Sequence, residues 1–208
     1  ADGAARARAA VEMADVHYFA GQIAEARRLA DEAVSVSNDP ATRLKARNVL
    51  GKLLLDNSRW SEAEAHFAAD AWEAACSGDA LAELRARLNR AIALMSSDRR
   101  DEARTMLASV LADGESQGQL RAVCFALANL SIIALWKHEY ADALALSRKA
   151  WNLPGHDDFK AAVGDLHLFL DDAAHHLQQV EAELPWSVVH GEAGAPARNA
   201  ARSLVLLR

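Results

Sequence analysis

The stretch LANLSIIALWKHEYADALALSRKAWNLP, residues 127–154, decides the fold of this chain. Leu127, Leu130 and Ala134 recur at steps of three and four residues, and this spacing places side chains on one face of a helix. The polar residues 137–139 interrupt the pattern, and a second apolar helical pattern follows them. The stretch therefore predicts two antiparallel helices joined by a tight turn.

The second helix of this hairpin carries the residues that allow close packing. The small side chain of Ala143 permits a near approach to the first helix, Tyr140 fills the space at the turn, and Pro154 cannot continue a helix. A single helical hairpin cannot bury its apolar face, so it needs neighbours of the same kind. Three upstream segments repeat the pattern of a turn, an acidic residue, an alanine and an apolar helix: residues 21–34, 58–71 and 98–111.

The repeat has a nearly constant length. The matching alanines are Ala26, Ala63, Ala103 and Ala143, so successive segments are 37, 40 and 40 residues apart. One helical hairpin per period of about 40 residues is typical of a solenoid, in which each hairpin packs on the next. The sequence is 51% hydrophobic but only 6% aromatic, and its many alanines favour helices in close contact. These features predict an all-α fold.

The pattern resembles the tetratricopeptide repeat family over roughly residues 5–155. The period is longer than the family's usual length of about 34 residues, and it looks more like the longer-helix repeats of large bacterial regulators. In the third repeat, Arg87 and Arg90 stand where apolar residues are expected. The residues at the family's small, aromatic and proline positions are Gly21, Ala33, Trp60, Tyr140, Ala150, Pro154 and the four pairs of an acidic residue with alanine.

The resemblance implies an α-α superhelix of four helical hairpins. The expected hairpins occupy residues 5–37, 41–76, 80–116 and 120–154. Between them, Asp39 is expected to cap a helix that begins near Pro40, and Gly78 to end one. The first helix, residues 1–19, is expected to direct Ala10, Met13, Ala14 and His17 inward.

Beyond the repeats, residues 158–184 predict one long helix. Its apolar residues from Phe159 to Leu184 alternate between steps of four and three, which makes one continuous apolar stripe. We expect this helix to cap the stack, so that the solenoid and its cap together occupy residues 1–184. The alternative is a dimerisation helix, since such a stripe can also pair with its own copy and form a homodimer. Residues 185–208 predict a linker and the start of a further, truncated helix.

Charge and hydropathy exclude several classes of function. The net charge of −6 argues against nucleic-acid binding, which requires a basic surface. No apolar run approaches the ~18 residues that cross a membrane. Because the chain also lacks an initiator Met and a signal peptide, we expect a piece of a larger, cytoplasmic protein. Cys76 and Cys124 are interpreted as two buried thiols.

The sequence shows no pattern of catalytic residues. An HExxH motif, a glycine-rich phosphate loop and a nucleophile elbow are all missing from it. Adjacent carboxylates such as Asp171 and Asp172 point to different faces of a helix, whereas acid–base catalysis needs convergent groups. His167, Asp171 and His175 lie four residues apart and could share a metal ion, but a solvated helix face explains them better. We expect no enzymatic activity, no cofactor and no bound metal.

The resemblance places the binding surface on the first helices of the hairpins, which line the inner groove of such stacks. The expected partner-binding residues run from polar to apolar along this groove: Tyr18, Phe19, Lys45, Asn48, Lys52, Arg85, Ile92, Phe125, Ile132 and Trp136. Some members of the family hold a peptide's C-terminal carboxylate with Lys, Asn and Arg. Lys45, Asn48, Lys52 and Arg85 supply these residue types at a different spacing. Alternatively, the apolar residues of the fourth repeat are simply covered by the cap helix.

These observations predict a protein–protein interaction module. It would serve as a scaffold or sensor region of a larger bacterial signalling or transcription regulator and would bind a partner's helix or extended peptide in the groove. A sensor that holds a small molecule at the apolar end of the groove is one alternative. Dimerisation through residues 158–184 is the other.

Overall fold

The computed structural model describes residues 2–154, and the segments predicted as a cap helix and as a truncated helix lie outside this range. The described part contains eight α-helices and no strand, so the predicted all-α fold is confirmed, as is the α-α superhelix. The helices are α1 (Asp2–Phe19), α2 (Ile23–Val36), α3 (Pro40–Asp56), α4 (Trp60–Ser77), α5 (Ala80–Ser96), α6 (Arg100–Ser116), α7 (Leu120–Trp136) and α8 (Tyr140–Trp151).

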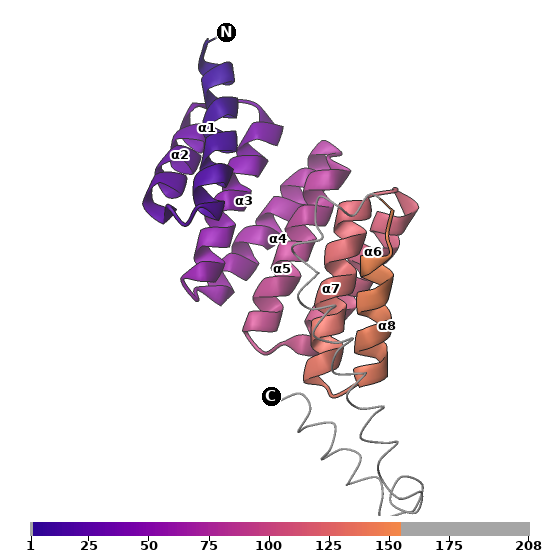
Figure 1. Ribbon diagram of the computed structural model, residues 1–208. Coiled ribbons are helices and arrows are strands. Elements are labelled where there is room, and N and C mark those ends of the chain that lie inside the picture. Colours follow the sequence, from indigo (N-terminus) through magenta and orange to yellow (C-terminus); the bar gives the residue numbers. More distant parts are fainter. Residues whose placement is uncertain (1, 155–208) are drawn as a thin grey trace, which may run out of the picture.

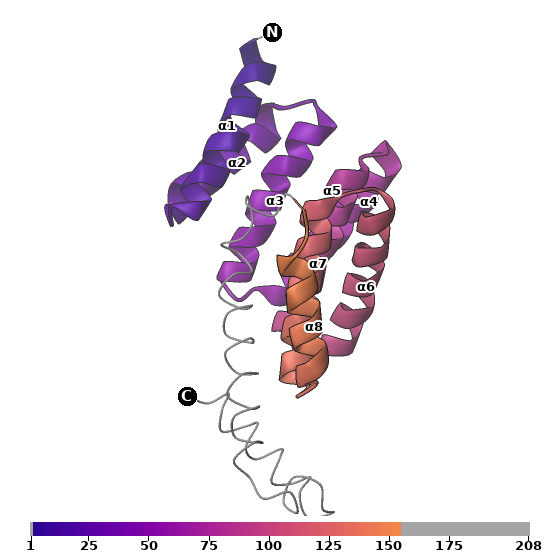
Figure 2. The same ribbon diagram turned by 45° about the vertical axis from the view of Figure 1, so that its right-hand side comes forward.

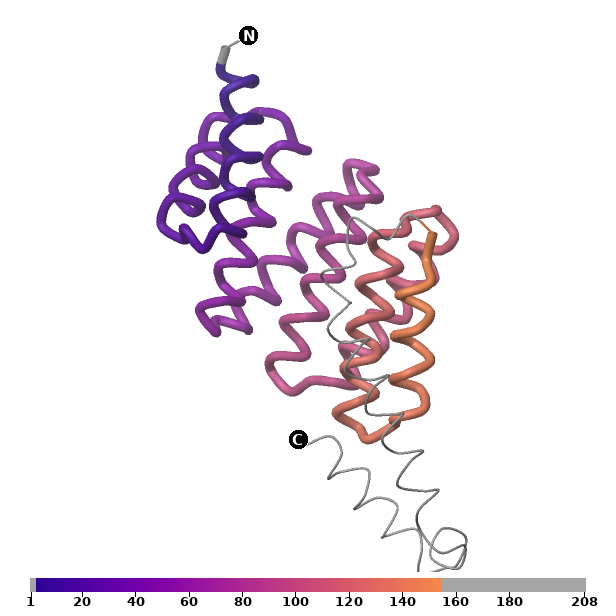
Figure 3. Tube along the Cα trace, in the orientation of Figure 1, coloured from indigo at the N-terminus to yellow at the C-terminus, as the bar shows by residue number. Residues whose placement is uncertain are grey.

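The helices form four hairpins that follow one another along the stack (Figure 1), and the chain reverses direction at each connection (Figure 3). The first helices of successive hairpins contact one another, α1 with α3, α3 with α5 and α5 with α7. Each first helix also packs against the second helix of the preceding hairpin. We call the surface formed by α1, α3, α5 and α7 the inner face.

The turns inside the four hairpins have one common geometry. Gly21, Ser58, Asp98 and His138 all have a left-handed backbone, with φ between 58° and 72°. In each turn the next residue donates its backbone N–H to a carbonyl five positions earlier, as Glu139 N does to Ala134 O at 2.9 Å. This bond satisfies a free carbonyl at the helix end. The shared geometry therefore fixes equivalent positions in all four hairpins.

The connections between hairpins use the capping residues that the sequence predicts. Asp39 accepts a hydrogen bond from the backbone N–H of Thr42 at 3.1 Å, and Pro40 begins α3. Gly78 ends α4 in a left-handed conformation, φ 72°, which glycine adopts without steric cost. These local signals determine where the helices start and stop.

Two large apolar clusters lie inside the stack. One joins α1, α2 and α3 around residues such as Ala14, Leu29 and Leu53, and the other joins α5, α6 and α7 around residues such as Leu94 and Leu107. Figure 2 shows α3 between the α1–α2 hairpin and the rest of the stack. The packing between α3 and α4 therefore connects the two halves.

The structure corrects three expectations about single residues. Met13 is 51% exposed and does not point inward, because Ala10 and Ala14 occupy the buried face of α1. His17 is partly exposed and bonds to the side chain of Gln22 at the turn. Cys76 is exposed, whereas Cys124 is buried as predicted.

The two arginines of the third repeat have a structural role. Arg87 lies 2.7 Å from Asp113, and Arg90 lies 3.1 Å from Glu64. These side chains therefore pair with neighbouring second helices at the positions where the family resemblance leads one to expect apolar residues.

The four alanines that set the repeat are all fully buried, which makes each one a sensitive packing position. We expect Ala143→Leu to destabilise the fold by about 1–3 kcal/mol, because the added atoms overpack the contact between α7 and α8. The matched control is Ala141→Leu, which changes an exposed position on the same helix. Thermal or urea unfolding of both variants measures the difference, and equal stability would contradict the packing.

Candidate functional site

The inner face carries side chains at equivalent positions of successive hairpins. Arg8, Lys45, Arg85 and Phe125 each stand thirteen residues before the left-handed residue of their turn. Asp15, Lys52, Ile92 and Ile132 each stand six residues before it. Both rows change from charged to apolar between the first hairpin and the last.

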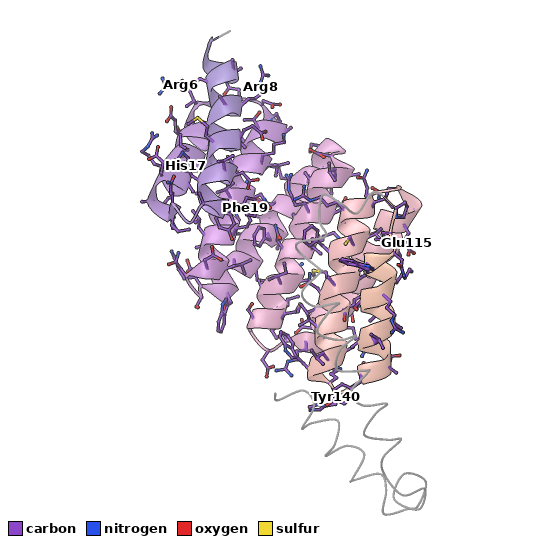
Figure 4. The ribbon with its side chains drawn as sticks, in the orientation of Figure 1. Arg6, Arg8, His17, Phe19, Glu115 and Tyr140 are labelled. Carbon is purple, nitrogen blue, oxygen red and sulfur yellow. The ribbon has the colours of Figure 1, made fainter. Side chains whose placement is uncertain are left out.

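A hollow opens on the inner face between α1, α3 and α5. Its volume is about 120 Å³, and it is small for a ligand site, since drug-sized ligands occupy about 300–1,000 Å³. Arg8, on the same helix as three of the lining residues, lies near the opposite end of α1 from Phe19 (Figure 4). The residues that line the hollow are Val11, Glu12, Asp15, Lys45, Asn48, Val49 and Arg85.

The lysines of this region are already paired. Lys45 lies 3.3 Å from Glu12, and Lys52 lies 2.5 Å from Asp15. The Nζ atom of Lys52 also lies over the rings of Tyr18 and Phe19, 4.3 and 4.8 Å from their centroids. The two lysines therefore neutralise acids of their own chain.

Tyr18 lies at the edge of this charged region. Burial, together with the nearby carboxylates of Asp56 and Asp15, raises its pKa to about 12. The neutral phenol is therefore the form present at physiological pH, and Tyr18 contributes a hydrogen-bonding group and an apolar ring to the inner face. Phe19 next to it is 71% exposed.

Arg85 differs from both lysines. It lines the hollow and is partly buried, yet it has no ion-pair partner among the described residues. Burial lowers its pKa, the charges of Asp79, Asp15 and Asp70 raise it in part, and the positive charge of Arg121 on α7 has a smaller lowering effect. Arg121 also lacks an ion-pair partner in residues 2–154, and its guanidinium carbon lies 5.8 Å from the centroid of the Phe125 ring. The inner face thus presents unpaired guanidinium groups on the neighbouring first helices α5 and α7.

Asparagine side chains lie beside the hollow. Asn89 Nδ2 on α5 donates to Asn48 Oδ1 on α3 at 2.7 Å. Each amide retains further hydrogen-bonding capacity after this bond, since an amide offers two N–H donors and a carbonyl oxygen. The pair can therefore bond to another polar chain on the inner face.

The apolar residues lie toward the α7 end. Phe125 and Ile132 on α7 and Ile92 on α5 are all partly buried, and Phe125 and Ile132 pack against the cluster of α5, α6 and α7. Trp136 is 42% exposed, and its ring lies 5.0 Å from the guanidinium carbon of Arg100 on α6. Trp136 is thus placed at the turn end of α7, against a second helix.

One polar cluster was not predicted from the sequence. Between α3 and α4, Asp70 is only 2% exposed and lies 2.6 Å from Arg47 Nη2 and 3.5 Å from His66 Nε2. Burial raises the pKa of Asp70, while His66 and Arg47 lower it. The His66–Asp70 spacing of four residues was the available signal, but it is common on solvated helix faces. The cluster connects two helices, and the charges of Asp70 and of Arg85, which lines the hollow, act on each other.

Within residues 2–154, no group of three or more His, Cys, Asp or Glu side chains could hold a metal ion. His167, Asp171 and His175, interpreted from the sequence as a solvated helix face and not as a metal site, lie outside the described part of the chain. None of the helices in the described range is long and apolar enough to cross a membrane.

No family model and no curated protein matches the sequence. Two solved structures are similar in fold, each with a TM-score of 0.62. The apo form of RapI is 13% identical, over 98% of this chain and 83% of that chain. Aspartyl phosphate phosphatase F from Bacillus subtilis is 18% identical, over 97% of this chain, which spans 59% of that protein. Both are helical-repeat proteins, and the low identity limits the likeness to the fold.

Proposed function

We propose that this chain is a protein- or peptide-binding module whose partner lies across the inner face. The observation that supports this most directly is the order of side chains along the equivalent rows, which are charged on α1 and α3, carry Arg85 and Ile92 on α5, and are apolar on α7. An extended peptide or a helix that crosses these helices can meet both kinds of surface, as groove-binding partners do. The module would belong to a larger cytoplasmic signalling regulator.

The side chains that line the hollow support a binding role without catalysis. Its two acids, Glu12 and Asp15, are each paired with a lysine of a neighbouring helix, an arrangement that supports a structural role for both acids. One structural neighbour is named as a phosphatase, but this chain spans only 59% of it at 18% identity. We therefore propose that the described repeats contribute recognition.

The small volume of the hollow favours a peptide over a small-molecule ligand. About 120 Å³ accommodates a side chain, whereas drug-sized ligands need several times this space. We also propose that residues 158–184 pack on the last hairpin as a cap. If instead that segment pairs with its own copy, the purified chain will be a dimer in solution.

The test changes one apolar residue of the inner face. Short peptides that bind the full chain are first selected from a random displayed library. We expect Ile92→Glu to weaken these peptides by about tenfold or more, because it places a charge in an apolar contact. Fluorescence polarisation measures the affinity.

The control is Thr105→Glu, which adds the same charge at an exposed position on the second helix α6. It should leave affinity unchanged. Melting temperatures of both variants should stay close to that of the parent, since Ile92 is outside the fully buried set. Peptides that bind Ile92→Glu as tightly as the parent would place the binding surface elsewhere and contradict the proposal.

A further inference from the structure

Among the charged residues that line the hollow, Arg85 is the one that forms no ion pair with another described residue. Lys45 and Glu12 form one pair, and Lys52 and Asp15 form another, so the two acids that line the hollow are already paired with lysines. The charges of Asp79, Asp15 and Asp70 also act on Arg85, but from beyond ion-pair distance. Arg85 lines the same hollow, is partly buried and has no ion-pair partner in the described range. A partly buried cation without a partner is costly in the free protein, and an incoming anion would remove that cost.

The surroundings of Arg85 indicate which anion fits. Arg121 adds a second unpaired positive charge from α7, and its field reaches Arg85. Glu12 and Asp15 line the hollow as well, and they would repel a doubly charged phosphate more strongly than a singly charged carboxylate. A carboxylate can also accept two parallel hydrogen bonds from one guanidinium group.

The position of Arg85 in the stack indicates whether the carboxylate lies within the partner peptide or at its C-terminus. Polar residues of α3, such as Asn48, lie on one side of Arg85, and the apolar residues Phe125 and Ile132 of α7 lie on the other. A peptide that contacts both sides passes Arg85 and does not end there. The Asn48–Asn89 amides are available to the peptide's own backbone.

We propose that Arg85, supported by Arg121, binds an acidic side chain within the partner peptide, next to apolar residues that contact α5 and α7. This inference rests on the proposed binding function and specifies the partner's chemistry. It differs from recognition of a peptide's C-terminus, because the carboxylate comes from an internal Asp or Glu.

The experiment uses two matched peptide sets on the full chain. One set contains Asp or Glu and has amidated C-termini, and the other lacks acidic residues and has free C-terminal carboxylates. We expect binders from the first set. Arg85→Gln should weaken them by at least about tenfold, the loss expected when one charged hydrogen bond is removed. Substituting the acidic residue of the peptide with its amide should produce the same loss.

Arg27→Gln is the matched control, since Arg27 is also partly buried and without an ion pair among residues 2–154, but lies on the second helix α2. It should not change affinity. Arg85→Gln should change the melting temperature little, because it removes a partly buried charge that forms no ion pair within residues 2–154. A structural role for Arg85 would instead lower stability and leave the peptide contacts intact.

Three outcomes would overturn the inference. If only peptides with a free C-terminal carboxylate bind, Arg85 recognises the end of the peptide and not an internal acidic side chain. If peptides bind Arg85→Gln as tightly as the parent but bind Ile92→Glu more weakly, Arg85 does not contact an acidic side chain, and the proposed function still holds. If neither set binds the inner face at all, the proposed function fails together with the inference.

Discussion

Arg47→Ala is expected to destabilise the fold by about 3–5 kcal/mol, because it leaves a buried carboxylate without its cation. Arg47 bridges Asp70 and Glu73, with both contacts at 2.6 Å. The side chain of Asp70 is only 3% exposed, and neither of its oxygens has a hydrogen-bond donor of good geometry among the described residues. Urea unfolding of the parent and the variant measures the loss.

The cost of Arg47→Ala should depend on pH. Burial raises the pKa of folded Asp70 above its unfolded value, so the folded state holds that proton more tightly. Protonation of Asp70 therefore stabilises the folded protein at low pH, and this contribution is lost as the pH rises through the folded pKa. Without Arg47 the carboxyl takes up a proton even more readily. The destabilisation should thus shrink as the pH falls from neutral toward mildly acidic values.

Arg87→Ala provides a matched control. Arg47 and Arg87 each stand eleven residues before the left-handed residue of their turn, and both side chains are 21% exposed. The partners of Arg87 are more exposed, 33% for Glu83 and 43% for Asp113. Exposed pairs contribute roughly 0–1 kcal/mol, so Arg87→Ala should cost about 1 kcal/mol or less. Equal losses in the two variants would show that burial of Asp70 does not matter.

Gly51→Ala is expected to destabilise the fold by about 1–3 kcal/mol, although alanine favours a helix by about 1 kcal/mol over glycine. A Cβ atom at Gly51 would lie 2.5 Å from two atoms of the Phe67 ring. Phe67 is fully buried between the two halves of the stack, so its ring cannot move aside into solvent.

The equivalent positions in the other hairpins show why this glycine is needed. Seven residues before the turn residue stand Ala14, Gly51, Ala91 and Ser131. Nine residues after the turn residue, Phe67 stands where the third hairpin has Leu107. In the third hairpin an alanine thus accompanies a leucine, whereas the large ring of Phe67 leaves room only for glycine. The glycine and the aromatic ring form one complementary pair.

A double variant tests this pairing. Gly51→Ala together with Phe67→Leu reproduces the Ala91–Leu107 pair and should lie within about 1 kcal/mol of the parent. The two single changes should therefore be strongly non-additive, as expected for side chains in direct contact. Additive losses, measured by urea unfolding of all four proteins, would contradict the contact. Together with Arg47→Ala, the result shows whether α3 and α4 hold the two halves together.

The repeat and its turns could be predicted from the sequence alone. The alanine spacing of 37, 40 and 40 residues and the apolar periods predict the helical hairpins, and Asp39, Pro40 and Gly78 mark helix ends. All of these are local signals, because a helix period or a capping residue acts within a few positions of the chain. The resemblance to the repeat family also led to the prediction that the first helices of the hairpins line the inner groove.

Only the tertiary structure decided which charged side chains of the inner face form ion pairs. Lys45, Lys52 and Arg85 look alike in sequence, but the two lysines meet acids on α1, 33 and 37 residues away, and Arg85 does not. The buried contact of Asp70 with Arg47 likewise joins two helices. A period places a side chain on a face of its own helix, but its partners depend on how neighbouring helices rotate and pack. For this reason the sequence determined the stack, and only the packed structure showed which of its charges remain unpaired.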